Sequence, residues 1–167
     1  MDKIYVLGHM PPDLDSVAAA ISYSNFKNLQ EGTDKYVPAF ADSLNKETEY
    51  VLEKFGFEAP EKLDTLAGKN VILVDHNEFS QAATGIEEAK LLEILDHHKM
   101  DFKYGEPIQV LIRPWGSSCD IIYDLYMSAG IEIEKNMAGL MLSASLVDKV
   151  ISKSPTSTPV DNEIMTI

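Results

Sequence analysis

The chain has 167 residues, of which 45% are hydrophobic and 25% charged, and this composition is typical of one globular domain. No segment reaches the ~18 consecutive apolar residues of a membrane span, so we expect no membrane partner. The formal net charge of −13 argues against a nucleic-acid partner, because such proteins neutralise phosphates with clustered Lys and Arg. The acidity favours solubility and also leaves carboxylates available for cations.

The single cysteine, Cys119, excludes an internal disulfide and is typical of a reducing compartment. The N-terminus passes from Met1 directly into an apolar run, without the pattern of a secretory signal. We therefore expect a cytoplasmic protein.

Strand and helix patterns alternate along the chain, and Asp15 or Ser16 is expected to cap the first helix. In chain order, we expect a strand over 3–8, a helix to about residue 30, a strand over 36–41, a helix over 45–55, strands over 70–75, 91–96 and 106–112, helices over 117–129 and 136–150, and a loop over 154–159. Pro107 restricts the last strand to an edge or an end of the sheet. The alternation predicts an α/β fold with a doubly wound, mostly parallel sheet and helices on both faces.

Every histidine follows an apolar run and lies beside carboxylates. His9 precedes Asp13 and Asp15 after the first strand, and the other three histidines follow the strands over 70–75 and 91–96. Ligands of open parallel sheets bind outside the carboxyl ends of the strands, so these clusters are expected to converge. Imidazole nitrogen and carboxylate oxygen together suit Mn, Fe, Co or Zn. The sequence therefore predicts a metal site with more than one ion.

The first two clusters also have structural interpretations. Asp13 and Asp15 could cap a helix while His9 fills a turn. Asp75 directly follows four aliphatic residues, where a carboxylate gains little structurally, so we expect it to be a ligand. His76 is interpreted as a partner of a ligand or a neutral loop residue rather than a ligand.

Adjacent histidines in an extended segment point in opposite directions. We therefore expect one of His97 and His98 to bind a metal and the other to meet the substrate as an acid or hydrogen-bond donor. Asp96 is expected to fix the tautomer of one imidazole. The alternative for the whole cluster is a solvated turn.

Asp148 continues an inward stripe of the last helix that begins with Met137, Met141 and Ala144. A carboxylate on such a face binds a metal or pairs with a buried Lys or Arg. The neighbouring Lys149 and the later Lys153 could contact a substrate phosphate or belong to a solvated face.

Four motifs occur in a fixed order: Gly-His-x-x-Pro-Asp-x-Asp-Ser (8–16), Val-Asp-His-Asn-Glu (74–78), Asp-His-His (96–98) and Lys-Ser-Pro-Thr (153–156). Together they resemble the DHH phosphoesterase superfamily. Within it, the chain is similar to the family II, manganese-dependent inorganic pyrophosphatases. The first and third motifs are shared by the superfamily, whereas the second and fourth favour the pyrophosphatase branch.

The resemblance implies two Mn²⁺ ions, with Co²⁺ or Mg²⁺ as substitutes, and a metal-bridging water as nucleophile. It assigns one ion to His9, Asp13 and Asp75, and the other to Asp15, Asp75, His97 and Asp148. It makes Asp75 and His98 the catalytic residues, with His98 contacting the phosphate and protonating the leaving group. Lys149 is a further candidate for substrate binding, and the residues expected to support the ligands are Asp96, His76 and Asn77.

Two departures from the family pattern stand out. The last helix reads Leu-Val-Asp-Lys where the family more often has Ser-Asp-Thr. Family members also carry a C-terminal domain whose Lys and Arg grip pyrophosphate, and this chain stops at Ile167. We therefore expect residues 1–167 to form the DHH metal domain alone, which binds metal and hydrolyses pyrophosphate weakly.

The resemblance also implies a homodimer and pyrophosphate bound as a magnesium complex. Two alternatives remain open from the sequence. The first is another DHH phosphoesterase or nuclease that acts on short oligonucleotides or cyclic dinucleotides. The second is a domain that binds metal without catalysis.

Overall fold

The structure, a computed structural model, describes residues 2–151. The elements in chain order are β1 (Ile4–Leu7), α1 (Leu14–Glu31), β2 (Tyr36–Phe40), α2 (Lys46–Phe55), β3 (Glu61–Lys62), β4 (Asn70–Val74), the 3-10 helices η1 (Phe79–Gln81) and η2 (Ile86–Glu88), β5 (Lys90–Asp96), β6 (Gln109–Ile112), α3 (Ser118–Ala129) and α4 (Lys135–Ile151). The predicted elements before residue 151 are confirmed within a few residues at each end. The predicted loop over 154–159 lies outside the described residues.

Within residues 2–151, six strands form one sheet in the order β3-β2-β1-β4-β5-β6, and all neighbouring strands are parallel. From β1 the chain winds toward β3, and from β4 it winds toward β6. The point where the winding reverses therefore lies between β1 and β4, which is where open α/β sheets bind ligands. β6 is an edge strand, as Pro107 indicated.

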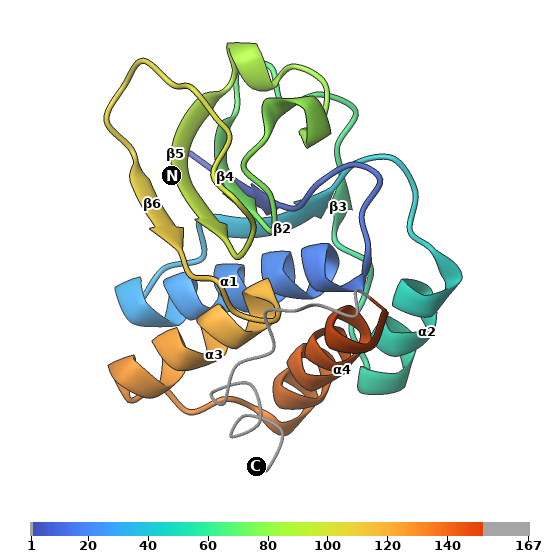
Figure 1. Ribbon diagram of the computed structural model, residues 1–167. Helices are drawn as coiled ribbons and strands as arrows, with labels where there is room; N and C mark the ends of the chain where they lie inside the picture. Colours follow the sequence, from blue (N-terminus) through green and yellow to red (C-terminus); the bar gives the residue numbers. More distant parts are fainter. Residues whose placement is uncertain (1, 152–167) are drawn as a thin grey trace.

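Among the described residues, all four α-helices cover one face of this sheet (Figure 1). α1 packs on the central strands, α3 and α4 pack on α1, and α2 lies against α4. The short helices η1 and η2 cover the other face, where Ala83 and Ile86 pack in the same cluster as Leu73 and Ile94. The predicted α/β fold with helices on both faces is confirmed, and the second face carries only single 3-10 turns.

The buried run in β4 shows why its sequence lacks alternation. Ile72 and Val74 belong to the cluster under the α-helices, whereas Val71 and Leu73 belong to the cluster under η1 and η2. Both faces are covered, so each residue of the run is apolar.

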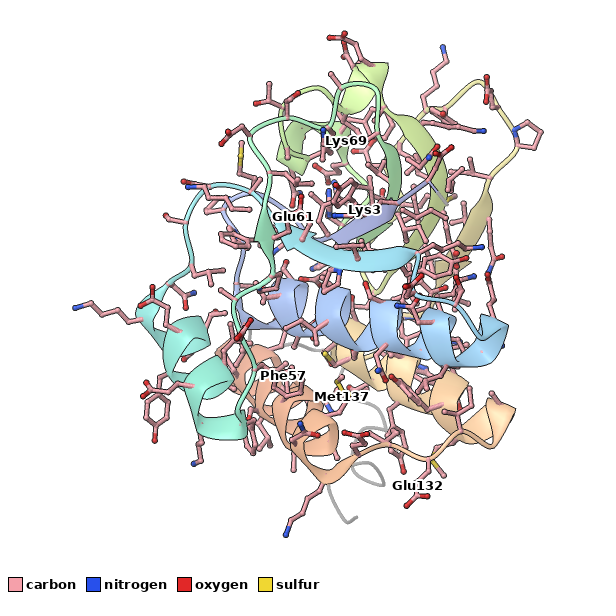
Figure 2. All side chains as sticks on the ribbon, turned by 180° about the vertical axis from the view of Figure 1, so that it is seen from behind. Lys3, Phe57, Glu61, Lys69, Glu132 and Met137 are labelled. Carbon is pink, nitrogen blue, oxygen red and sulfur yellow. The ribbon has the colours of Figure 1, made fainter. Side chains whose placement is uncertain are left out.

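The sequence analysis did not predict β3, η1 or η2. β3 consists of two exposed residues without an apolar pattern, and only its pairing with β2 defines it as a strand. Figure 2 shows Lys3 and Glu61 close together on this side of the sheet, where Lys3 Nζ lies 3.3 Å from Glu61 Oε2. An exposed ion pair of this kind contributes little to stability.

The first expectation for the cap of α1, Asp15 or Ser16, was wrong, whereas the alternative that Asp13 acts as a cap is confirmed. Asp13 caps the helix instead of Asp15 or Ser16, because its backbone is still extended and its Oδ1 accepts a hydrogen bond from Ser16 N (2.9 Å). Asp15 therefore lies in the first helical turn, where its side chain is buried. Among the helices of residues 2–151, none combines the length and apolar character needed to cross a membrane.

Gly8 directly follows β1 and lies against Ser16 in the first turn of α1. A Cβ atom there would lie 2.4 Å from Ser16 Cβ and 2.8 Å from Ser16 Cα. Gly8→Ala therefore forces the backbone after β1 away from the first turn of α1. We expect this variant to lower the free energy of unfolding by about 1–3 kcal/mol. Gly105→Ala is the matched control, because a Cβ there meets no atom within 4 Å, and its effect should stay within about 0.5 kcal/mol. Chemical denaturation of both variants checks this, and equal stabilities would contradict it.

Candidate metal centre

The predicted convergence of the acidic clusters at one edge of the sheet is confirmed. His9 follows the end of β1 by two residues, Asp75 directly follows β4, and His97 directly follows β5. β4 lies between β1 and β5 in the sheet, so Asp75 is the middle of the three.

Asp75 is the centre of the arrangement. Its Oδ1 lies 3.2 Å from His97 Nε2 and accepts a hydrogen bond from Ser118 Oγ (3.1 Å). Its Oδ2 lies 3.5 Å from His9 Nε2 and accepts a hydrogen bond from Ser16 Oγ (2.8 Å). Each oxygen of this buried carboxylate therefore faces one histidine and one serine.

The backbone of Asp75 adopts a left-handed conformation with φ 63°, which costs a non-glycine residue about 1–2 kcal/mol. Its N–H still donates to Leu95 O (2.9 Å), so the ladder between β4 and β5 continues up to the turn. The strained residue therefore lies at the point where the chain turns away from β4. Asparagine and aspartate tolerate this left-handed conformation better than most other non-glycine residues.

His9 and His97 are both oriented by backbone carbonyls. His9 Nδ1 lies 2.7 Å from Pro11 O, and His97 Nδ1 lies 3.0 Å from Trp115 O. A carbonyl only accepts, so Nδ1 carries the proton in each ring. In the neutral ring, Nε2 then presents a lone pair toward Asp75, as a metal-ligating histidine does.

Two groups of ligand atoms meet around Asp75, and the atoms in each group lie within 4.8 Å of one another. The first group is His9, Asp13 and Asp75, and the second is Asp15, His97 and Asp148. Asp13 Oδ2 lies 3.3 Å from His9 Nε2, and Asp148 Oδ2 lies 3.5 Å from His97 Nε2. A third such group, also around Asp75, adds Asp96 and His98.

Asp15 and Asp148 reach the centre from helices. Asp15 is buried in the first turn of α1, where its Oδ2 accepts from Ser118 N (2.7 Å) and its Oδ1 from Cys119 N (3.2 Å). Asp148 lies on the inward stripe of α4 that the sequence predicted, in which Met137 and Met141 are buried.

His97 and His98 do not point in opposite directions, and that expectation was wrong. Their ring centroids lie 4.0 Å apart, because the segment bends where an extended chain was assumed. The bend is made by Asp96 Oδ1, which accepts from His97 N (2.7 Å) and His98 N (3.2 Å). Asp96 Oδ1 also lies 2.8 Å from His98 Nδ1, so it fixes the tautomer of His98.

Asn77 and His76 are buried beside this bend. Asn77 Nδ2 donates to Asp96 Oδ2 (2.6 Å), and Asn77 Oδ1 accepts from Asp101 N (2.6 Å). Asn77 therefore ties Asp96 to the loop after it. His76 Nδ1 lies 3.0 Å from Val74 O, and desolvation by burial lowers the pKa of His76.

Lys149 pairs with a buried carboxylate. Its Nζ lies 2.9 Å from Asp120 Oδ2, and only 8% of the side chain is exposed. The expectation that Lys149 meets a substrate phosphate stays a prediction. Lys153 lies outside the described residues.

The electrostatics of the cluster depend on its histidines. Burial alone would lower the pKa of His97 and His9, but the carboxylates around them raise it to about 10 for His97 and about 9 for His9. Burial would raise the pKa of Asp75, yet the contact with His97 and the charge of His9 lower it below its ordinary range. Burial and the charge of Asp75 raise the pKa of Asp148 to about 6.

The donor set fits divalent transition metals. Two imidazole nitrogens and several carboxylates suit Mn²⁺, Fe²⁺, Co²⁺ and Zn²⁺. His97 Nε2 is buried and lacks a hydrogen bond of good geometry, although Asp75 and Asp148 approach it. A metal ion would satisfy this nitrogen and the carboxylates together.

Sequence patterns did not reveal the groups that hold the ligands. Ser16 and Ser118 bond Asp75, and the carbonyl of Trp115 orients His97. Serines and backbone carbonyls carry no distinctive pattern. The one available signal was that Ser16 belongs to the motif over 8–16.

The comparisons with known proteins agree with this geometry. The α/β fold is that of a candidate family II inorganic pyrophosphatase from Methanococcus jannaschii, with a TM-score of 0.88 and 41% identity over 98% of this chain and 54% of that chain. The family model described as the N-terminal domain of the DHH family matches residues 3–145. The chain therefore belongs to the DHH family.

Curated relatives carry a common name. A manganese-dependent inorganic pyrophosphatase of Methanothrix thermoacetophila is 50% identical over 161 residues, which cover 96% of this chain and 51% of the relative. Another from Methanocaldococcus jannaschii is 43% identical over 168 residues, which cover 96% of this chain and 52% of the relative. The chain thus spans about half the length of the curated relatives it matches.

The stability of the metal-free protein should depend on pH through His9 and His97. Their pKa values of about 9 and 10 lie above the value of about 6.5 in an unfolded chain, so their charge stabilises the fold at pH 6.5 and below. This contribution is lost as the pH rises through 9 to 10. Unfolding free energies measured with a chelator at pH 6.5, 8 and 10 should fall more steeply for the wild type than for a variant that combines His9→Gln with His97→Gln. Parallel pH profiles would contradict the assignment.

Proposed function

We propose that this chain is the metal-binding domain of a manganese-dependent inorganic pyrophosphatase, which hydrolyses pyrophosphate to two phosphates. The observation that carries the proposal is that the buried Asp75 belongs to the group with His9 and Asp13 and also lies 3.2 Å from His97 Nε2 of the second group. The names of the relatives support the metal and the substrate. Residues 1–167 would form one domain, and the remaining half of the relatives would complete the substrate site.

Two Mn²⁺ ions would be held by separate ligand sets. The proposed sets are His9, Asp13 and Asp75 for the first ion, and Asp15, Asp75, His97 and Asp148 for the second. The orientation of both imidazoles by backbone carbonyls supports this assignment. When bound, two such ions lower the pKa of an attacking water and neutralise charge in a phosphoryl transfer.

The charge of the cluster supports cations as part of the substrate site. Its five carboxylates are Asp13, Asp15, Asp75, Asp96 and Asp148. Pyrophosphate is itself an anion, and like charges at close range repel strongly in a partly buried site. Metal binding is therefore required before the substrate can approach.

His98 is the residue best placed to act on the leaving group. Its Nδ1 is engaged by Asp96, which leaves Nε2 for a phosphate oxygen, and its side chain is 54% exposed. The hydrogen bond with Asp96 raises the pKa of His98, which favours the protonated ring. As water attacks phosphorus and the bridging P–O bond breaks, Nε2–H donates to the departing oxygen. Asn77 and Asp96 hold the ring in place for this step.

Further properties are proposed with the function. Pyrophosphate would bind as its magnesium complex, and Co²⁺ or Mg²⁺ could replace Mn²⁺. The protein would be a cytoplasmic homodimer that binds neither nucleic acid nor membranes. The net charge of −13 supports the expectation about nucleic acid.

Asp75→Ala should weaken the binding of both ions by more than about 100-fold, since both sets use this carboxylate and loss of a mere supporting contact already costs about 10–100-fold. Asp64→Ala is the control, because Asp64 is exposed and belongs to none of the ligand groups. Equilibrium dialysis counts the Mn²⁺ bound, and phosphate release is measured from pyrophosphate and from a dinucleotide. A wild-type chain that binds no Mn²⁺, or that cleaves only the dinucleotide, would refute the proposal. Two bound ions without any release would favour a domain that binds metal without catalysis.

Mn²⁺ affinity should rise with pH between 6 and 8. His9 and His97 hold protons in the metal-free protein over this range, because their pKa values are about 9 and 10, and each must release its proton to bind a metal. Each ion should therefore bind about tenfold more tightly per pH unit. Calorimetry in buffers of different ionisation enthalpy counts the protons released. Binding without proton release would contradict the two histidines as ligands.

A further inference from the structure

The segment over residues 115–120, called the 115–120 turn below, combines the end of the loop after β6 with the first residues of α3, and it contacts the second proposed ligand set repeatedly. Trp115 O lies 3.0 Å from His97 Nδ1 and so sets the direction of the ring. Ser118 N and Cys119 N donate to the two oxygens of Asp15, at 2.7 and 3.2 Å. One short segment therefore orients two ligands that come from opposite ends of the sequence.

The same turn reaches the shared carboxylate. Ser118 Oγ donates to Asp75 Oδ1 (3.1 Å), which is the oxygen that faces His97. The other oxygen, Oδ2, faces His9 and accepts from Ser16 Oγ (2.8 Å). The two serines thus hold opposite ends of one carboxylate, and only Ser118 belongs to the turn.

The last residue of the turn holds the end of α4. Asp120 Oδ2 lies 2.9 Å from Lys149 Nζ, and Asp120 Oδ1 accepts from Ser145 Oγ (2.8 Å). Both charged side chains are buried, and Lys149 directly follows Asp148. Removing one partner from a buried ion pair leaves an uncompensated charge, so this pair firmly fixes the helix beside the ligand.

Local sequence explains why the turn can approach so closely. Gly116 lets the aliphatic chain of Lys149 pass over the backbone, since a Cβ atom there would lie 2.5 Å from Lys149 Cε. Ser117 caps α3 by accepting a hydrogen bond from Asp120 N (3.2 Å). The first amides of α3 consequently point at Asp15.

The first ligand set takes its support from another segment. His9 Nδ1 is held by Pro11 O, and Asp13 is fixed by its role as the cap of α1. The first contact lies within the loop between β1 and α1, and the second joins this loop to the first turn of α1; both are far in sequence from residues 115–120.

We infer that the 115–120 turn is a positioning device for the second metal position, formed by Asp15, Asp75, His97 and Asp148, and that the loop between β1 and α1 positions the first. This inference rests on the proposed function, because it concerns the ions that the proposal assigns. Its positioning residues are Ser118, through its hydroxyl, and the pair of Asp120 and Lys149. Each of them acts through a ligand or through the helix that carries one.

The test uses the full 167-residue chain and follows Mn²⁺ binding by electron paramagnetic resonance, which separates isolated ions from spin-coupled pairs. Ser118→Ala should weaken one class of Mn²⁺ site by about 10–100-fold and leave the other within twofold. The Mn²⁺ titration of Ser118→Ala should resemble that of Asp148→Asn, a variant that removes a ligand of the second position. Ser118→Thr keeps the hydroxyl and should restore the coupled signal.

Ser16→Ala is the matched control, since it removes the donor to the opposite oxygen of Asp75. Ser16→Ala should weaken the class of Mn²⁺ site that is lost in Asp13→Asn. Asp120→Asn provides a second variant of the turn and should weaken the same class as Ser118→Ala, while thermal unfolding of the metal-free chains verifies that each variant folds.

The outcomes distinguish a failure of the positioning inference from a failure of the proposed function. A wild type that binds two coupled ions, together with a Ser118→Ala chain that keeps both affinities or loses both equally, would overturn the positioning inference alone. A wild type that binds no Mn²⁺ would overturn the proposed function and the inference with it.

Discussion

Asp75 holds a negative charge where water hardly reaches it, and a carboxylate in such a place stays ionised only beside cations and hydrogen-bond donors. The protein supplies both kinds of partner to each oxygen: His9 and Ser16 on one side, His97 and Ser118 on the other. These four groups come from four segments spread over more than a hundred residues. The order of the central strands and the placement of α1 and α3 all serve to bring these segments to one carboxylate.

The helices contribute charge as well as packing. Both α1 and α3 begin at the edge of the sheet where the carboxylates gather, and the N-terminus of a helix carries a partial positive charge. At α3 this effect acts through two amides on Asp15, and at α1 it acts on the capping carboxylate of Asp13. The helical face of the sheet (Figure 1) therefore stabilises the acidic cluster, whereas the thin face under η1 and η2 mainly buries apolar strand residues.

Much of the architecture could be predicted because it depends on local patterns. Strand ends placed His9, Asp75 and Asp96 at one edge, and the helical stripe placed Asp148 beside them. Contacts between distant segments could not be predicted: Lys149 pairs with Asp120, and β3 exists only through its pairing with β2. The directions of the adjacent histidines were misjudged because the side chain of Asp96 bends the chain after β5, an effect that strand geometry does not include.

The two ligand sets differ in their access to solvent, and this difference has a kinetic consequence. The side chain of Asp13 is 48% exposed and that of His9 20%, whereas His97 is 10% exposed and Asp15 is almost completely covered. An ion beside Asp13 can exchange protein ligands for water one at a time. An ion in the second set has fewer exposed ligands, since Asp148 is the one member of that set whose side chain is more than 10% exposed. The second position would therefore exchange its ion more slowly than the first. The residence times of the two ions would differ even if their affinities were equal.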